Sequence, residues 1–303
     1  MNGKGNLIAL ALVTLVTAAA FGWIGWDLAH PDPTQGKQAA NRAPADNVDN
    51  VVEAPASSSQ DATSAEDSLG SDNSKQAAQK ASPLTGMRIG IDPGHNGRNG
   101  SHPDQVNRLV DAGTLRKACD TTGTVSRSGL TESSYNLDVA RRVEQLLEDR
   151  GATVVMTRTT DTGWGPCIDE RARITNQAEV AVSIHADGNL KPGSRGFHVI
   201  VPARVPDMPA DTLAASRQLG SAIRDALDEG SSIPRSNYLG QDGIDVRSDL
   251  GGLNLSRIPK VLVETGNMKH AEDAAVLESP AGRQRIAQAI VAGLEAWAKQ
   301  QTT

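Results

Sequence analysis

The sequence is poor in the features that cysteine-based metal sites and nucleic-acid binding require. It contains only two cysteines, Cys119 and Cys167, and neither has a second cysteine at the spacing of about two to four residues typical of zinc-binding pairs. Lysine and arginine total 30 against 36 aspartate and glutamate, and no basic cluster could hold a phosphate backbone. These absences argue against a cysteine-ligated metal and against nucleic acid as a partner.

Residues 31–83 lack aromatic side chains and isoleucine and contain one leucine, Leu69. Alanine, serine, aspartate, asparagine and glutamine dominate, so this stretch cannot bury enough apolar surface to offset the entropy of ordering. We predict a disordered linker that is either a tether through a polymer layer or an inert spacer. Residues 84–303 are then the only folded domain, because they are long enough to form a core.

The N-terminus carries one early charge, Lys4, followed by the uncharged run Leu7–Trp26. We interpret residues 1–30 as a signal peptide or a membrane anchor. Ala18–Ala20 would suit cleavage, whereas Trp23 and Trp26 would suit an uncleaved span with interfacial aromatics. Both readings export the domain to the periplasm, cell wall or exterior, and an uncleaved segment would add a membrane attachment. In an oxidising compartment Cys119 and Cys167 are expected to form a disulfide, the alternative being two free thiols.

From Met87 onward short apolar runs alternate with amphipathic segments, which predicts an α/β domain with a mostly parallel twisted sheet flanked by helices. We expect strands at 87–92, 153–157, 180–185, 197–201 and 261–264. We expect one helix capped by Ser133 and Ser134 and ending at Gly151, and others at 169–177, 211–228 and 280–299. Residues 96–127 are expected to form a long surface loop.

Three of the predicted strands end in residues that can bind a metal or carry a proton. His95 follows the first strand, His185 ends the third and Glu264 ends the last, while Glu132 precedes the helix after the long loop. Ligands of parallel sheets bind at the carboxyl ends of the strands. Two histidines and a carboxylate form a common catalytic zinc set. We therefore predict His95, Glu132 and His185 as Zn²⁺ ligands and Glu264 as the general base, although each alone could be a structural residue.

Five short motifs strengthen this prediction. They are Ile89–His95 (IGIDPGH), Thr131-Glu132, Thr157-Arg158, Ser183–Asp187 (SIHAD) and Val261–Gly266 (VLVETG). In this order the chain resembles the zinc-dependent N-acetylmuramoyl-L-alanine amidases of the Amidase_3 type, over about Gly86 to Ala298. The resemblance implies hydrolysis of the amide between the lactyl group of N-acetylmuramic acid and L-alanine of peptidoglycan, in cell-wall remodelling and daughter-cell separation. It also implies that His95, Glu132 and His185 bind zinc and that Glu264 is catalytic. The cysteine pair and the long loop are similar to those of actinobacterial members that act on mycobacterial-type walls.

Other polar residues near the strand ends are weaker candidates. Asp92 and Asp187 are candidates to orient the ligand histidines. Four residues in the Gly-rich approach to the last strand are candidates to bind stem-peptide carboxylates, the alternative being a solvated loop: Asp245, Arg247, Asn254 and Arg257.

The stretch between His185 and Glu264 has little room for the inserted helix that plugs the zinc site of some Gram-negative division amidases. We therefore expect a monomer that is not self-inhibited in that way, acts on peptidoglycan and is restrained by location, access or an unidentified protein regulator. Two alternatives remain at this point. One is a catalytically inactive wall-binding or regulatory module, and the other is a zinc peptidase or deacetylase that acts on the cell wall.

Overall fold

The computed structural model describes residues 82–301. The predicted N-terminal segment, residues 1–30, lies outside this range, as does the predicted linker, residues 31–83, apart from its last two residues. Within the described range no helix is both long enough and apolar enough to cross a lipid bilayer.

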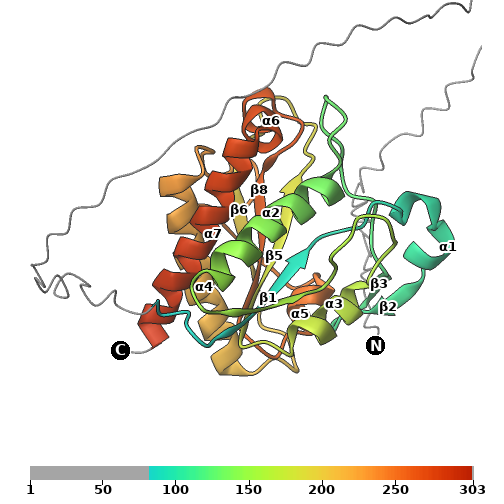
Figure 1. Cartoon of the computed structure of the whole chain (residues 1–303). Coiled ribbons are helices and arrows are strands. Elements are labelled where there is room, and N and C mark those ends of the chain that lie inside the picture. The colour runs from blue at the N-terminus through green and yellow to red at the C-terminus, as the bar shows by residue number, and fades with distance from the viewer. Residues whose placement is uncertain (1–81, 302–303) are drawn as a thin grey trace, which may run out of the picture. The chain divides into compact units, whose positions relative to one another are not determined.

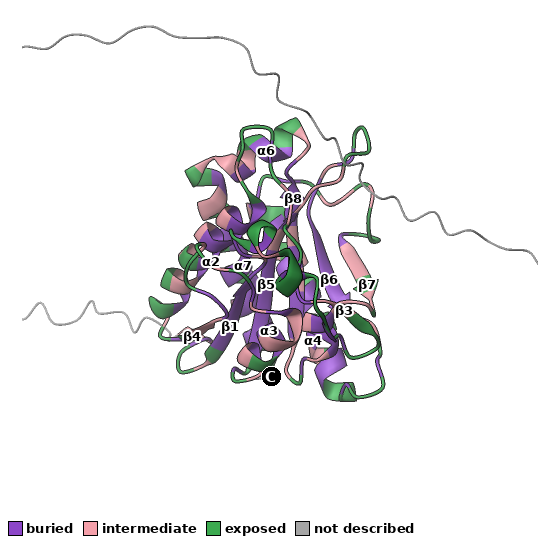
Figure 2. Cartoon of the chain, turned by 90° about the vertical axis from the view of Figure 1, so that its right-hand side faces the viewer, coloured by how far each residue is buried: buried purple, intermediate pink, exposed green. Residues whose placement is uncertain are grey.

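A six-stranded sheet forms the centre of the fold, in the order β4-β1-β5-β8-β6-β7 (Figure 2). All neighbouring pairs are parallel except β6 and β8, which pair antiparallel. A separate antiparallel pair consists of β2 and β3. The strands are β1 (Arg88–Pro93), β2 (Leu109–Asp111), β3 (Arg116–Ala118), β4 (Thr153–Met156), β5 (Val180–Asp187), β6 (His198–Pro202), β7 (Ile244–Arg247) and β8 (Lys260–Asn267). The predicted α/β class with a mostly parallel sheet is confirmed.

Helices cover both faces of this sheet. Figure 1 shows α2, α4 and α7 on one side and α3, α5 and the β2–β3 pair on the other. The main core lies between the sheet and the helices α2, α4 and α7. The aromatic side chains of Tyr135, Phe197 and Trp297 are buried in it. The helices are η1 (Asn99–Ser101), α1 (Pro103–Val106), α2 (Glu132–Glu148), α3 (Ile168–Thr175), α4 (Ala210–Gly230), α5 (Gly251–Asn254), α6 (Ala271–Glu278) and α7 (Pro280–Gln301).

The five strands expected from apolar runs are present as β1, β4, β5, β6 and β8. A sixth strand of the sheet, β7, was not predicted. It lies at the sheet edge and leaves Val246 54% exposed, so its sequence IDVR lacks the continuous apolar run of a buried strand.

The prediction that residues 96–127 form one long surface loop was wrong. This stretch contains η1, α1 and the paired strands β2 and β3, each only three or four residues long. Elements this short and this exposed produce no readable hydrophobic period. The helix α6 was missed as well, and α2 is capped by Thr131, whose hydroxyl accepts from Ser134 N at 3.3 Å, rather than by Ser133 or Ser134. Gly151 follows α2 with φ +79°, as a helix-ending glycine requires.

The sheet brings residues that are distant in the sequence to one end, where the strands β1, β5 and β8 finish. β1, β5 and β8 are parallel neighbours, so their carboxyl ends lie together. His95 follows β1, His185 lies near the end of β5, and Glu264 pairs with His185 in the register of β5 and β8. Residues far apart in the chain can therefore act at one point.

Candidate metal centre

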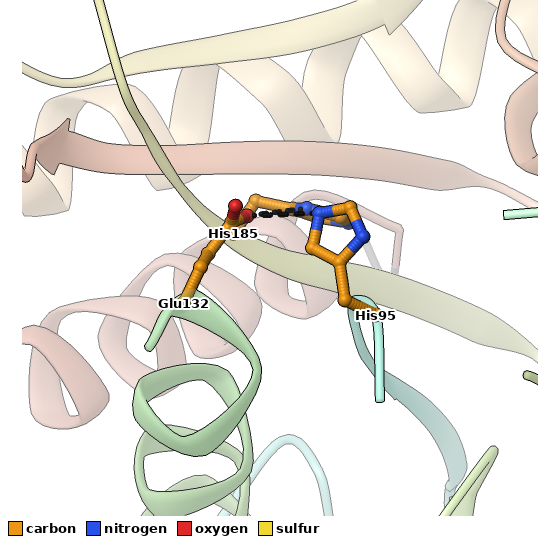
Figure 3. Close-up of side chains that lie close together, drawn as sticks. All are labelled: His95, Glu132 and His185. Carbon is orange, nitrogen blue, oxygen red and sulfur yellow. Dashed lines mark hydrogen bonds and ion pairs between the residues drawn. The ribbon is translucent and has the colours of Figure 1, made fainter. Parts of the chain in front are cut away.

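The side chains of His95, Glu132 and His185 converge at the carboxyl ends of these strands (Figure 3). One potential ligand atom from each lies within 4.8 Å of the others. Glu132 Oε1 is 3.2 Å from His95 Nε2 and 3.0 Å from His185 Nδ1. The structure thus brings together the three residues that the sequence nominated as ligands. Two imidazoles and one carboxylate at this spacing could hold a metal ion, and zinc suits such a ligand set.

Gly94 and Gly123 have no side chain, and this makes room for the side chains of the three candidate ligands. A Cβ atom at Gly94 would overlap the ring of His185. A Cβ atom at Gly123 would lie 2.8 Å from both Glu132 Oε2 and His95 Cδ2, and Gly123 also has φ +72°. Larger residues at either position would displace the candidate ligands, so the backbone itself is adapted to this cluster.

Glu132 is held as an anion. It is the first residue of α2, where the helix dipole favours negative charge. Its Oε2 accepts a hydrogen bond from Thr124 N at 2.9 Å, and its Oε1 faces both histidines. Burial opposes ionisation, but His95 and His185 hold the pKa of Glu132 well below its usual value. The cluster therefore presents a fixed negative charge suited to a cation.

Asp120 fixes the orientation of His95. The Nδ1 atom of His95 lies 3.1 Å from Asp120 Oδ1 and 3.1 Å from the carbonyl oxygen of Thr121. Both neighbours are acceptors, so Nδ1 carries the proton and Nε2 is left to bind a metal. Although burial opposes protonation, Glu132 and then Asp120 raise the pKa of His95 to about 10 in the metal-free protein. Sequence reasoning missed Asp120, whose one signal was its place next to Cys119.

Arg171 connects this pair to the scaffold. Its Nη2 donates to Asp120 Oδ2 at 3.1 Å and to the carbonyl oxygen of His95 at 2.8 Å. His95 has φ +59°, an uncommon conformation for a residue other than glycine. A hydrogen bond to its carbonyl oxygen helps to hold that backbone in place, so Arg171 acts on both the ring and the main chain of His95.

Asp92 does not orient a histidine, contrary to the sequence-based expectation. It accepts hydrogen bonds from Thr157 at 2.7 Å, Arg171 at 2.9 Å, Ser183 at 2.9 Å and Lys260 at 3.2 Å. Burial opposes its ionisation, but Lys260 and Arg171 hold the pKa of Asp92 far below its usual range. Its partners come from β5, β8, α3 and the end of β4, so Asp92 ties together the elements beneath the cluster.

Asp187 likewise forms no hydrogen bond with a histidine of residues 82–301. It accepts from the hydroxyl of Tyr238 at 2.8 Å and from Gly188 N at 2.6 Å. The expectation that it orients a ligand was therefore wrong. It lies instead on the side of the cluster that carries Glu264, where its negative charge raises the pKa of that residue.

Glu264 lies beside the cluster on β8. It pairs with His185 of β5 and with His198 of β6, so the three side chains project from the same face of the sheet. Its Oε2 is buried and has no hydrogen-bond partner among residues 82–301. Burial, and then the negative charges of Glu132 and Asp187, raise the pKa of Glu264 well above its usual value. A carboxylate with this environment is suited to accept and return a proton.

Two of the four candidates for substrate contact, Arg247 and Asn254, are committed to other partners. Arg247 forms two hydrogen bonds with Asp249, at 2.8 and 2.7 Å. Asn254 is buried, and its amide donates to the carbonyl oxygens of Ala112 and Ser248 at 2.8 Å each. Asp245 lies in β7, and Arg257 is exposed beside a groove of about 530 Å³ that Asn254 also lines.

The predicted disulfide between Cys119 and Cys167 is present. Cys119 directly precedes Asp120, and Cys167 is the N-cap residue of α3, the helix that carries Arg171. The backbone of the two cysteines is also joined by a hydrogen bond from Ile168 N to Cys119 O at 2.8 Å. The crosslink therefore fastens the loop that supports His95 to helix α3.

A cavity of about 190 Å³ adjoins the two histidines. One part of its lining is polar and includes Asp92 and Lys260, and another is apolar and includes Ile168, Leu253 and Leu262. Space for a small group thus exists next to the candidate ligands.

The sequence and the fold were compared with those of known proteins. Residues 89–296 match the protein family described as N-acetylmuramoyl-L-alanine amidase. In sequence, the chain is similar to the N-acetylmuramoyl-L-alanine amidase Rv3717 of Mycobacterium tuberculosis, with 42% identity over 214 residues, which cover 70% of this chain and 86% of the relative.

Two solved structures of mycobacterial enzymes are similar as well. The N-acetylmuramyl-L-alanine amidase Ami1 of Mycobacterium smegmatis shares 41% identity with a TM-score of 0.67, covering 72% of this chain and 99% of its own. The apo form of Ami1 from Mycobacterium abscessus shares 40% identity with a TM-score of 0.66, covering 71% and 99%.

Proposed function

Because this chain belongs to the N-acetylmuramoyl-L-alanine amidase family and is therefore a peptidoglycan hydrolase, we propose that it acts outside the cytoplasm as a zinc enzyme, with Glu264 as its general base. The observation that carries the proposal is the convergence of His95, Glu132 and His185 beside the unpaired carboxylate of Glu264. No single segment supplies this arrangement, since the four residues come from three strand ends and one helix start.

His95 Nε2, Glu132 and His185 would hold the zinc ion. When bound, zinc would polarise the scissile carbonyl group and lower the pKa of the attacking water. Glu264 takes the proton of that water and returns it to the departing amine of L-alanine. Its raised pKa makes Glu264 a stronger base for the first step and keeps the carboxyl group protonated until the amine departs.

Location outside the cytoplasm is supported by two features. The uncharged run Leu7–Trp26 is suited to export, and the disulfide between Cys119 and Cys167 is typical of proteins in oxidising compartments. Peptidoglycan lies in such a compartment.

The test is mass spectrometry of the products that the zinc-loaded protein releases from purified peptidoglycan. We expect stem peptides with a free L-alanine amino group, absent when zinc is chelated and absent with Glu264→Gln. Shortened peptides or deacetylated sugars would place the cleaved bond elsewhere. Binding to the wall without any product would contradict the catalytic proposal. The metal content of the purified protein should be about one zinc ion per chain, and another metal in its place would contradict zinc dependence.

A further inference from the structure

A second pocket opens at the same end of the sheet as the metal cluster. Its volume is about 370 Å³, and its lining includes Arg127, Asn189, Lys191, Asn267 and Lys269. We call it the basic pocket. Each of its three segments continues an element of the proposed active site: Arg127 lies shortly before Glu132, Asn189 follows β5 and Asn267 ends β8.

The segments that form the basic pocket are tied to one another. Asn267 Nδ2 donates to the carbonyl oxygens of Asn189 at 2.9 Å and Ser194 at 2.7 Å, and Lys269 Nζ donates to Val125 O at 2.6 Å. In Figure 1 the green segment ahead of α2 and the yellow segment after β5 rise beside α6 at one end of the sheet. The pocket is therefore formed by the fold before any ligand arrives.

The charge in the basic pocket is not compensated. No aspartate or glutamate lines it. Within residues 82–301, Arg127, Lys191 and Lys269 form no ion pair. Arg195, by contrast, pairs with Glu272 and Asp273, although it lies only four residues beyond Lys191. Three cations around one hollow without a counter-charge are suited to an anionic ligand.

We propose that the basic pocket binds the free α-carboxylate of the D-glutamyl residue that follows the L-alanine at the cleaved amide. The inference rests on the proposed amidase function and names a charge preference for the substrate. The occupant belongs to the substrate because the pocket adjoins the segments that carry Glu132, His185 and Glu264. Two arginines had been nominated for this role from the sequence. The guanidinium of Arg247 is committed to Asp249, and Arg257 lines a different groove, so the basic pocket is better suited to the task.

The experiment compares two soluble muropeptides that differ only in one group. Both carry an L-alanyl-γ-D-glutamyl peptide on N-acetylmuramic acid, one with the free α-carboxyl and one with a carboxamide. For the zinc-loaded full chain we expect KM for the acid to be about tenfold lower than for the amide, with similar kcat. The preference should weaken as salt is raised, because exposed charges are screened.

The double variant Arg127→Ala/Lys191→Ala should lose this preference. We expect KM for the acid to rise about tenfold and KM for the amide to stay unchanged. A matched control is Arg217→Ala, which removes an exposed charge from α4 and should leave both values unchanged. Equal KM values in the wild type, or a preference that survives in the double variant, would overturn the proposal.

Failure of the proposed function is distinguishable from failure of this inference. If the wild type cleaves neither muropeptide at the lactyl amide, the amidase proposal fails. The basic pocket is then tested by calorimetric binding of the two free peptides, which needs no catalysis. Tighter binding of the acid that is lost in the double variant would support the pocket, and equal binding of acid and amide would overturn it.

Discussion

The two sides of the metal cluster differ in how their buried polar groups are satisfied. We call one side the His95 flank and the other the Glu264 flank. The His95 flank consists of Asp92, Asp120, Arg158, Arg171 and Lys260, and the Glu264 flank consists of Asp187, His198, Tyr238 and Glu264. No buried side-chain nitrogen or oxygen atom of the His95 flank lacks a hydrogen-bond partner among residues 82–301, whereas Glu264 Oε2 and His198 Nδ1 both lack one.

This difference indicates that the His95 flank holds the metal ligands in place, whereas the Glu264 flank supplies the group that takes part in the reaction. On the His95 flank, Arg158 donates to the carbonyl oxygens of Pro93, Gly94 and Ser133 at 2.7 to 3.0 Å, so charges hold the backbone around the ligands. A satisfied buried network rigidifies its surroundings. On the Glu264 flank, an unpaired carboxylate oxygen near two other carboxylates is costly to the fold but available to a proton. Substitutions on the two flanks should therefore have opposite effects on stability.

The largest effect is expected from Glu264→Gln. Loss of the general base should lower kcat by about 10³-fold, in the usual range for such groups. The thermal midpoint of the metal-free variant should rise, because an amide cannot ionise, whereas burial and then the charges of Glu132 and Asp187 oppose the ionisation of Glu264. Amidase assays check the first quantity and calorimetry checks the second. A variant that is inactive but less stable would contradict the contrast between the flanks.

On the His95 flank we expect the reverse from Asp92→Asn. Removing one partner of the buried Asp92–Lys260–Arg171 cluster should destabilise the metal-free protein by about 3–5 kcal/mol at neutral pH. The folded pKa of Asp92 is depressed, so its contribution is complete above the unfolded pKa of about 3.9 and is lost as pH falls below it. Urea unfolding at pH 7 and near pH 3 should show the wild-type and variant free energies converging at the lower pH. A constant difference would sink this explanation.

The disulfide contributes to the same flank. The variant Cys119→Ser/Cys167→Ser opens a loop of 48 residues, which should lower the free energy of unfolding by about 4 kcal/mol on a chain-entropy estimate. Because Cys119 adjoins Asp120, the zinc dissociation rate should rise too. Denaturant unfolding and transfer of zinc to a chromophoric chelator measure the two effects. A lower free energy of unfolding with an unchanged zinc dissociation rate would show that the disulfide does not support the metal cluster.

The sequence predicted the parts of the fold that are apolar and buried. The strands β5 and β8 are almost wholly buried, and their hydrophobic runs predict them directly. The missed elements are short or partly exposed, so local composition carries little signal for them; they are η1, α1, β2, β3, β7, α5 and α6.

For the candidate site, the ligand set could be predicted from the sequence because each residue adjoins a recognisable strand end or helix start. The residues that support the ligands could not be predicted in this way. Asp120 reaches His95 only through tertiary folding of the crosslinked loop, which no local pattern encodes. The commitment of Arg247 was different, since its partner Asp249 lies two residues away and the pair could have been read from the sequence.

The smallest effect we predict is that of Asp120→Asn, and it tests whether the His95 flank acts on the metal itself. Asparagine keeps the size of Asp120 but removes the charge that faces Nδ1 of His95 and Nη2 of Arg171. Supporting residues of this kind typically contribute about 10- to 100-fold to metal affinity, so the zinc dissociation constant should rise within that range. At saturating zinc kcat should stay within about threefold of the wild type, because Glu264 is untouched.

Ser101→Ala, which removes an exposed hydroxyl on η1, is a control that should change neither quantity. If Asp120→Asn instead lowered kcat at saturating zinc as strongly as Glu264→Gln does, the two flanks would not be separable, and Asp120 would belong to the reacting groups rather than to their support.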